Sequence, residues 1–143
     1  YFYRNAGKVN DTNIDASLIG LAWPFEIFDY QDIKIKNTIE AIEKNIVIDG
    51  GVHRYQFDYF DSEGSAAEGG GAWPVLNFWL SIYFIKIGNI KKARDYFIWP
   101  LDKLAPYQGY LPEQIFSDDR VGVYPLAWSY AMFIIAARHL GYL

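Results

Sequence analysis

Apolar residues recur at helical spacing in two stretches of the chain. The first set consists of Ile35, Ile39, Ile42 and Ile46, and lysines and glutamates surround it. The second set consists of Ile90, Ala93, Phe97, Leu101 and Leu104. Spacings of three and four residues place such side chains on one face of an α-helix. We therefore predict two amphipathic helices, beginning near residues 33 and 90, with Pro100 kinking or dividing the second.

Three further segments are apolar on nearly all sides, at residues 15–23, 72–87 and 125–140. A helix without a polar face needs neighbours all around it. Asp15 can cap the first of these helices, and Pro125 suits the first turn of the last. The sequence thus predicts an all-α fold in which buried and amphipathic helices alternate. This order is typical of helical hairpins in an (α/α) barrel, where outer helices enclose inner ones.

Two long connections separate these helices, at residues 49–71 and 105–124. Both are rich in glycine, tyrosine, arginine and carboxylates. Loops of this length in a helical protein are usually functional or disordered, and the aromatic content argues against disorder. Each connection precedes a predicted buried helix. In a barrel they would therefore lie on the same rim.

Composition excludes several classes of protein. The chain has 143 residues, of which 52% are hydrophobic and 21% charged, so we expect one globular unit over residues 1–143. A net charge of −4 gives no electrostatic footprint for nucleic acid. The absence of cysteine excludes thiolate nucleophiles and cysteine-based metal sites. Aromatic residues make up 19% of the chain, an unusually large share.

The first residues and one long uncharged stretch bear on where the chain begins and on its compartment. Residue 1 is tyrosine and the only methionine is Met132, so we expect a piece of a longer chain, with residues 1–14 as its start or a connecting segment. The first residues lack a signal-peptide pattern, which slightly favours the cytoplasm without fixing the compartment. The uncharged stretch 121–137 has the lower-limit length of a membrane span but contains Pro125 and Ser129. We predict a buried helix there and no membrane partner.

Metal and cofactor chemistry finds little support in the sequence. His53 and His139 lie far apart, so a structural role is expected for each. Asp58, Asp61 and Glu63 invite a calcium interpretation, but the spacing of an EF-hand loop is absent. Serine-hydrolase and phosphate-binding motifs are absent as well. We predict neither a metal nor a cofactor.

The residue types on the predicted rim suit a sugar. Aromatic rings lie against the apolar faces of sugars, while arginines, amides and carboxylates hydrogen-bond the hydroxyl groups. The candidates are Arg54, Tyr55, Asp58, Trp73, Glu113, Gln114 and Trp128. By residue type alone, core packing of the two tryptophans and a solvated Glu113 are the simpler interpretations.

Short motifs in these connections resemble the C-terminal half of the catalytic domain of glucoamylase-like enzymes, glycoside hydrolase family 15. Residues 111–114 (Leu-Pro-Glu-Gln), followed by residues 127–131 (Ala-Trp-Ser-Tyr-Ala), are similar to the family's catalytic-base segment and next inner helix. Residues 51–55 (Gly-Val-His-Arg-Tyr), then Asp58, then residues 71–73 (Gly-Ala-Trp) are similar to its preceding sugar-binding loop. Order and spacing carry the resemblance.

The resemblance implies about half of an (α/α)6 barrel of the six-hairpin type, and an inverting hydrolase that releases glucose from the ends of α-glucosides. Inversion needs one carboxylic acid and one carboxylate that activates water. By resemblance, Glu113 is the general base, and the general acid lies in an N-terminal half that this sequence does not contain. The same resemblance assigns sugar binding to Arg54, Tyr55, Asp58, Trp73, Gln114 and Trp128.

The implied partners are therefore an oligosaccharide or disaccharide and the missing half of the barrel, from the same chain or a partner chain. We expect this fragment to be inactive by itself. Three alternatives stay open: a trehalase of the same family, a noncatalytic sugar-binding relative, and a helical-repeat interaction module whose aromatic residues are all core.

Overall fold

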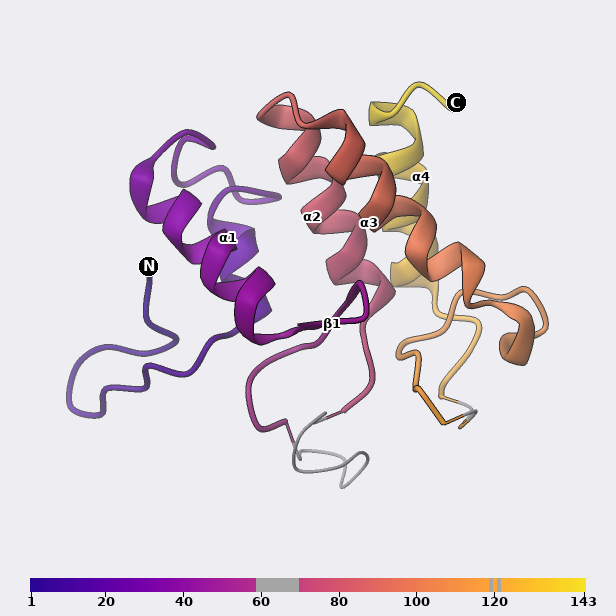
Figure 1. Ribbon diagram of the computed structural model, residues 1–143, viewed down its shortest axis with the longest axis horizontal. Helices are drawn as coiled ribbons and strands as arrows, with labels where there is room; N and C mark the ends of the chain where they lie inside the picture. Colours follow the sequence, from indigo (N-terminus) through magenta and orange to yellow (C-terminus); the bar gives the residue numbers. More distant parts are fainter. Residues whose placement is uncertain (59–69, 119, 121) are drawn as a thin grey trace.

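The computed structural model describes residues 1–58, 70–118, 120 and 122–143, and its elements are mostly helices (Figure 1). In chain order they are η1 (Ala16–Leu21), α1 (Ile33–Asn45), β1 (Val47–Ile48), β2 (Gly51–Val52), α2 (Pro74–Lys86), α3 (Ile90–Asp102), η2 (Ala105–Tyr107) and α4 (Ala127–His139). Helix α2 lies in the middle, with α1 on one side and α3 and α4 on the other. The calcium interpretation cannot be followed, because Asp61 and Glu63 lie outside the described residues.

Both predicted amphipathic helices are present and begin where the pattern placed them. In α1 the Asp32 side chain accepts a hydrogen bond from the Lys34 amide, and the isoleucine face is buried. In α3 the Asn89 side chain caps the first turn, and Ala93 and Phe97 are buried. Capping removes one of the unsatisfied donors at each start, so sequence pattern and local chemistry agree.

Helix α2 confirms the buried helix predicted over residues 72–87. Eleven of its thirteen residues are buried, because α3, α4, η1 and β2 all pack against it. Its Phe78 side chain is 0% exposed and contacts the rings of Phe97 and Phe133 at centroid distances of 5.7 and 5.9 Å. The centre of the core therefore lies along α2.

The first predicted helix is shorter and of another type than expected. Residues 16–21 form a 3-10 helix, not an α-helix over 15–23, although Asp15 caps it as predicted by accepting from the Ser17 amide at 2.8 Å. Pro24 supplies no amide hydrogen and restricts Trp23, so the helix cannot continue through this segment.

Two predictions about proline are also wrong in detail. Pro125 precedes the extended N-cap residue Leu126, whose amide donates to the Leu111 carbonyl, so Pro125 lies outside the first turn of α4. Pro100 does not divide α3, because it occupies the last turn and the helix ends at Asp102. The Tyr96 carbonyl, which loses its helical donor at Pro100, faces the Asn77 amide group at 3.5 Å.

The last helix departs from its prediction in burial. Only three of the thirteen residues of α4 are buried in this chain, and Trp128 and Ile134 are about half exposed. The apolar sequence thus lacks neighbours on one side. No helix in the described part of the chain has the length and apolar character needed to cross a membrane.

Candidate active site

The two long connections meet at the N-terminal ends of α2 and α4, as predicted (Figure 1). Ala72 pairs with His53 on one side and with Ile115 on the other. The Ala72 and Ile115 backbones exchange two hydrogen bonds of 2.9 and 2.8 Å, and the Trp73 amide donates to the Val52 carbonyl at 2.8 Å. This short ladder holds both loops in one fixed arrangement.

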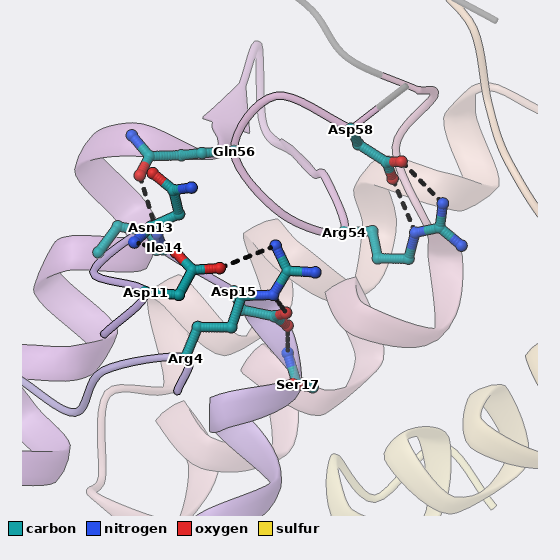
Figure 2. A network of polar contacts seen from close by, with 9 residues as sticks. All are labelled: Arg4, Asp11, Asn13, Ile14, Asp15, Ser17, Arg54, Gln56 and Asp58. Atoms are coloured by element: carbon teal, nitrogen blue, oxygen red, sulfur yellow. Dashed lines mark hydrogen bonds and ion pairs between the residues drawn. The ribbon is translucent and has the colours of Figure 1, made fainter. Parts of the chain in front are cut away.

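On one side of the ladder, Arg54 and Asp58 form a two-point ion pair (Figure 2). Arg54 Nε and Nη2 donate to the two carboxylate oxygens of Asp58 at 2.7 and 2.8 Å. Asp58 is 1% exposed, so burial of its charge depends on this pairing. The Arg54 side chain stays partly exposed and presents a fixed guanidinium at the rim.

Two aromatic rings flank the same guanidinium. Arg54 Cζ lies 4.9 Å from the centroid of the Tyr55 ring and 5.0 Å from that of the Trp73 ring. Burial, a side-chain hydrogen bond to Asp58 and the Asp58 charge raise the pKa of Tyr55, so its hydroxyl stays protonated and donates to that carboxylate. The structure therefore brings together four of the seven predicted residues.

Gln114 joins this group through the second loop. Its Oε1 accepts a hydrogen bond from the Gly71 amide at 2.9 Å. A Cβ on Gly70 would lie 2.8 Å from Gln114 Oε1 and 3.6 Å from Asp58 Oδ2, so both side chains flank that glycine. A side chain at position 70 would therefore require Gln114 Oε1 to move.

Glu113 is half-buried, and the backbone around it is firmly held. Its amide donates to the Val123 carbonyl at 2.8 Å, and the preceding Pro112 carbonyl accepts from Ser129 Oγ at 2.8 Å. The Glu113 carboxylate has no hydrogen-bond or ion-pair partner within the described part of the chain. A positioned carboxylate without a cation beside it can accept a proton.

Trp128, on the first turn of α4, is 52% exposed. No ring contact or hydrogen bond within residues 1–58 and 70–118 joins it to the Arg54 group. Its neighbour Ser129 is fully buried and binds the Pro112 carbonyl, so the first turn of α4 is attached to the loop of Glu113 while the Trp128 side chain is exposed.

Two fully buried polar residues support the site and were missing from the sequence-based candidates. Asn77 of α2 accepts from the Val52 amide at 2.9 Å and donates to the Gly50 carbonyl at 2.9 Å. Ser129 of α4 binds the Pro112 carbonyl. Each lies near the start of a buried or apolar helix and fixes one loop. An amide or hydroxyl side chain near the start of such an apolar helix is the signal that could have identified them.

The other side of the ladder carries a cavity of about 370 Å³. His53 and Ile115 line it, with side chains that include Trp99, Tyr107 and Phe116, whereas none of the seven predicted residues does. Successive side chains along extended backbone point to opposite faces, so the ladder separates this cavity from the Arg54 group.

The two histidines have structural surroundings. His53 is buried, and its Nδ1 donates to the Gly70 carbonyl at 2.8 Å. His139 packs edge-on against Trp23 at a centroid distance of 5.7 Å. Among the described residues, no three acidic or histidine side chains cluster closely enough to hold a metal ion.

Comparison with known proteins gives relatives of one kind. The sequence is 34% identical to an uncharacterised glycosyl hydrolase of Methanocaldococcus jannaschii over 92% of this chain and 23% of the relative. It is 32% identical to the isomaltose glucohydrolase of Kribbella flavida over 91% of this chain and 35% of that protein. It is 29% identical to a trehalase of Mycolicibacterium smegmatis over 93% of this chain and 20% of the trehalase. No protein-family model matches the sequence.

Solved structures lead to the same group of proteins. A glycosidase variant in complex with glucose superposes with a TM-score of 0.79 at 29% identity, covering 93% of this chain and 37% of that one. A bacterial glucoamylase complexed with acarbose superposes with a TM-score of 0.70 at 22% identity, covering 92% of this chain and 21% of the glucoamylase. At this identity the likeness supports a shared fold and nothing more.

This chain spans between 20% and 35% of the length of the three relatives above. Its helical fold is shared with glycosidase and glucoamylase structures over nearly its whole length. The predicted resemblance to glucoamylase-like enzymes is therefore confirmed, and the chain is a relative of one part of these longer glycoside hydrolases.

Proposed function

We propose that this chain is part of a longer, inverting glycoside hydrolase that releases glucose from the ends of α-glucosides. In this proposal Glu113 is the general base, which takes a proton from the attacking water. The general acid is supplied by a part of the enzyme outside this chain. The observation that carries the proposal is the half-buried, unpaired Glu113 carboxylate, which precedes Gln114 on a loop that the ladder joins to the loop of the Arg54–Asp58 pair.

The mechanism assigns different work to the two loops. The Arg54 guanidinium, which Asp58 holds, can donate to sugar hydroxyls, and the flanking rings of Tyr55 and Trp73 can lie against an apolar sugar face. Glu113 stands on the other loop, where water can approach the anomeric carbon. An inverting enzyme needs this separation, because water must fit between the base and the sugar.

The proposal also extends to the fold. Helices α2 and α4 would be inner helices of an (α/α)6 barrel, with α1 and α3 outside them. The exposed Trp128 and Ile134 on α4 support this arrangement, since further helices of a longer chain would cover them. We propose that a missing half of the barrel completes both the core and the site.

The first test uses the longer protein that contains this chain, with maltose, isomaltose and trehalose as substrates. Proton NMR during hydrolysis identifies the first anomer released, and inversion of an α-glucoside gives β-glucose. Release of the non-reducing unit of maltose or isomaltose as α-glucose would overturn the inverting mechanism, whereas trehalose gives one β- and one α-glucose under inversion and two α-glucoses under retention. Binding of these sugars without hydrolysis would instead favour a noncatalytic sugar-binding protein, and neither binding nor hydrolysis would favour an interaction module.

The second test concerns Glu113. We expect Glu113→Gln to lower kcat about 10³-fold with little change in sugar binding, because the base is lost while shape is kept. Asp118→Asn is the matched control: this carboxylate lies in the same loop but is exposed and paired with Arg120 at 2.7 Å. Azide should restore turnover to Glu113→Ala by attacking in place of activated water. Normal turnover by Glu113→Gln would remove Glu113 as the base.

Trehalose is the second candidate substrate. Its support is the 29% identity to a trehalase over 93% of this chain. Hydrolysis of trehalose with no activity on maltose or isomaltose would assign the longer protein to that activity. The role of Glu113 is the same in both cases.

A further inference from the structure

Arg4 ties the N-terminal segment to the start of η1. Its Nε lies 3.1 Å from Asp15 Oδ2, and its Nη1 lies 3.6 Å from Asp11 Oδ2 (Figure 2). Asp15 is itself fixed, because its Oδ1 caps η1 by accepting from the Ser17 amide at 2.8 Å. A carboxylate that both caps a helix and binds Arg4 leaves the guanidinium little freedom.

The same guanidinium lies against the candidate site. Arg4 Cζ is 4.2 Å from the centroid of the Tyr55 ring, closer than Arg54 Cζ at 4.9 Å. The backbones also run together, since the Ala16 amide donates to the Arg54 carbonyl at 2.8 Å and Asp15 pairs with Tyr55. Tyr55 thus has two guanidinium neighbours, one from each segment.

We propose that Arg4 is a positioning residue of the sugar site. Its contact with the Tyr55 ring holds the Tyr55 hydroxyl on Asp58 and thereby fixes the Arg54–Asp58 pair that meets the sugar. The inference rests on the proposed function of this group. It also makes residues 1–14 part of the site and not merely a connecting segment.

Loss of Arg4 should weaken binding more than turnover. Without it, one side of the Tyr55 ring loses a cation–π contact, and Asp15 loses its ion-pair partner. Tyr55 can then leave Asp58, so Arg54 is held less firmly where it donates to the sugar. Glu113 stands on the other loop and keeps its own supports.

The kinetic test uses Arg4→Gln and Arg4→Lys in the longer protein, with Lys8→Gln as the control. Lys8 lies exposed in the same segment, so this control changes the net charge equally. We expect Arg4→Gln to raise KM about five- to tenfold with kcat within about twofold, and Arg4→Lys to recover most of the loss. An unchanged KM, or a fall in kcat with KM constant, would overturn the inference.

A second measurement does not depend on hydrolysis. The protein is prepared with isotope-labelled tyrosine rings and studied by NMR. The Tyr55 signal is assigned as the one that disappears from the spectrum of the Tyr55→Phe variant. The hydrogen bond to Asp58 and the Asp58 charge raise the pKa of Tyr55 by more than the Arg4 charge lowers it, so a Tyr55 that leaves Asp58 in Arg4→Gln should titrate at lower pH, and Lys8→Gln should not shift it.

Together the two readouts separate the hypotheses. A shifted titration in a protein that binds no sugar would contradict the proposed function while showing that Arg4 acts on Tyr55. Sugar hydrolysis with neither a shifted titration nor a raised KM in Arg4→Gln would contradict the role of Arg4 alone.

Discussion

Helices α2 and α4 are built from the same kind of sequence but have different surroundings. Each has thirteen residues and no polar face. In α2 eleven residues are buried, whereas in α4 only three are, and the α4 residue Ile134 is 53% exposed. The difference shows that an apolar sequence indicates a helix suited to burial on all sides, while the number of elements packed against it depends on the fold.

The two helices are alike in how they hold the loops. Asn77 in α2 binds the hairpin that precedes Arg54, and Ser129 in α4 binds the residue that precedes Glu113. Both side chains are fully buried. A satisfied, buried polar group near the start of an apolar helix thus fixes a loop with little freedom to move. The two helices differ in how far their side chains are covered by other elements. Four predictions test this comparison.

The largest effect should come from truncating the two faces. Phe78→Ala in α2 should lower the free energy of unfolding by about 3–5 kcal/mol, because it empties the centre of the core. Ile134→Ala in α4 should cost no more than about 0.5 kcal/mol in this chain, since the side chain is already exposed. Urea unfolding measures both values.

The same Ile134→Ala substitution sharpens the comparison in the longer protein. If further helices cover α4, its cost should rise to about 2 kcal/mol or more. Ile98→Ala is the control, because Ile98 is 41% exposed on the amphipathic helix α3 and should stay close to neutral in both proteins. An equally small cost for Ile134→Ala in the longer protein would mean that α4 remains uncovered.

Removing the buried polar groups should have the next largest effect. Asn77→Ala leaves the Val52 amide and Gly50 carbonyl without this partner and should cost about 2–3 kcal/mol. Ser129→Ala removes one bond to the Pro112 carbonyl and should cost about 1 kcal/mol. Calorimetry of both variants tests the order, and a larger loss for Ser129→Ala would break the parallel between the helices.

A smaller effect on stability should distinguish Trp73, the N-cap residue of α2, from Trp79 within the helix. Trp73 Nε1 is buried and has no hydrogen-bond partner in the described part of the chain, whereas Trp79 Nε1 donates to Met132 Sδ at 3.1 Å. Trp73→Phe removes an unsatisfied donor, so stability should stay equal or rise by about 1 kcal/mol. Trp79→Phe should lower it. A loss on Trp73→Phe in the longer protein alone would reveal a partner outside this chain.

The smallest effect concerns the last turn of α4. Partial burial, with the nearby Lys86 and Arg138 charges, lowers the pKa of His139. The unfolded chain then binds a proton more readily than the folded one, so stability should rise with pH through the region just below the ordinary histidine pKa. His139→Gln should flatten this slope slightly in urea titrations at several pH values. An unchanged slope would show that His139 does not contribute.

Local sequence patterns were sufficient to predict the position of most helices. Isoleucines at helical spacing placed α1, and the apolar run after Trp73 placed α2, because these signals lie within one element. The hairpin of β1 and β2 escaped prediction, since two-residue strands carry no alternation to detect. The shared rim was predictable from loop positions, but the contact between Arg4 and Tyr55 was not, because it joins segments far apart in the sequence.

The sequence by itself determined which segments become helices, which of them are apolar, and which residue types could bind a sugar. It did so because helix formation and residue chemistry depend on near neighbours in the chain. Only the tertiary structure decided that Gln114 binds the Gly71 amide, that Arg4 reaches Tyr55, and that α4 keeps an uncovered face. These features depend on packing between segments far apart in sequence, which local patterns do not encode.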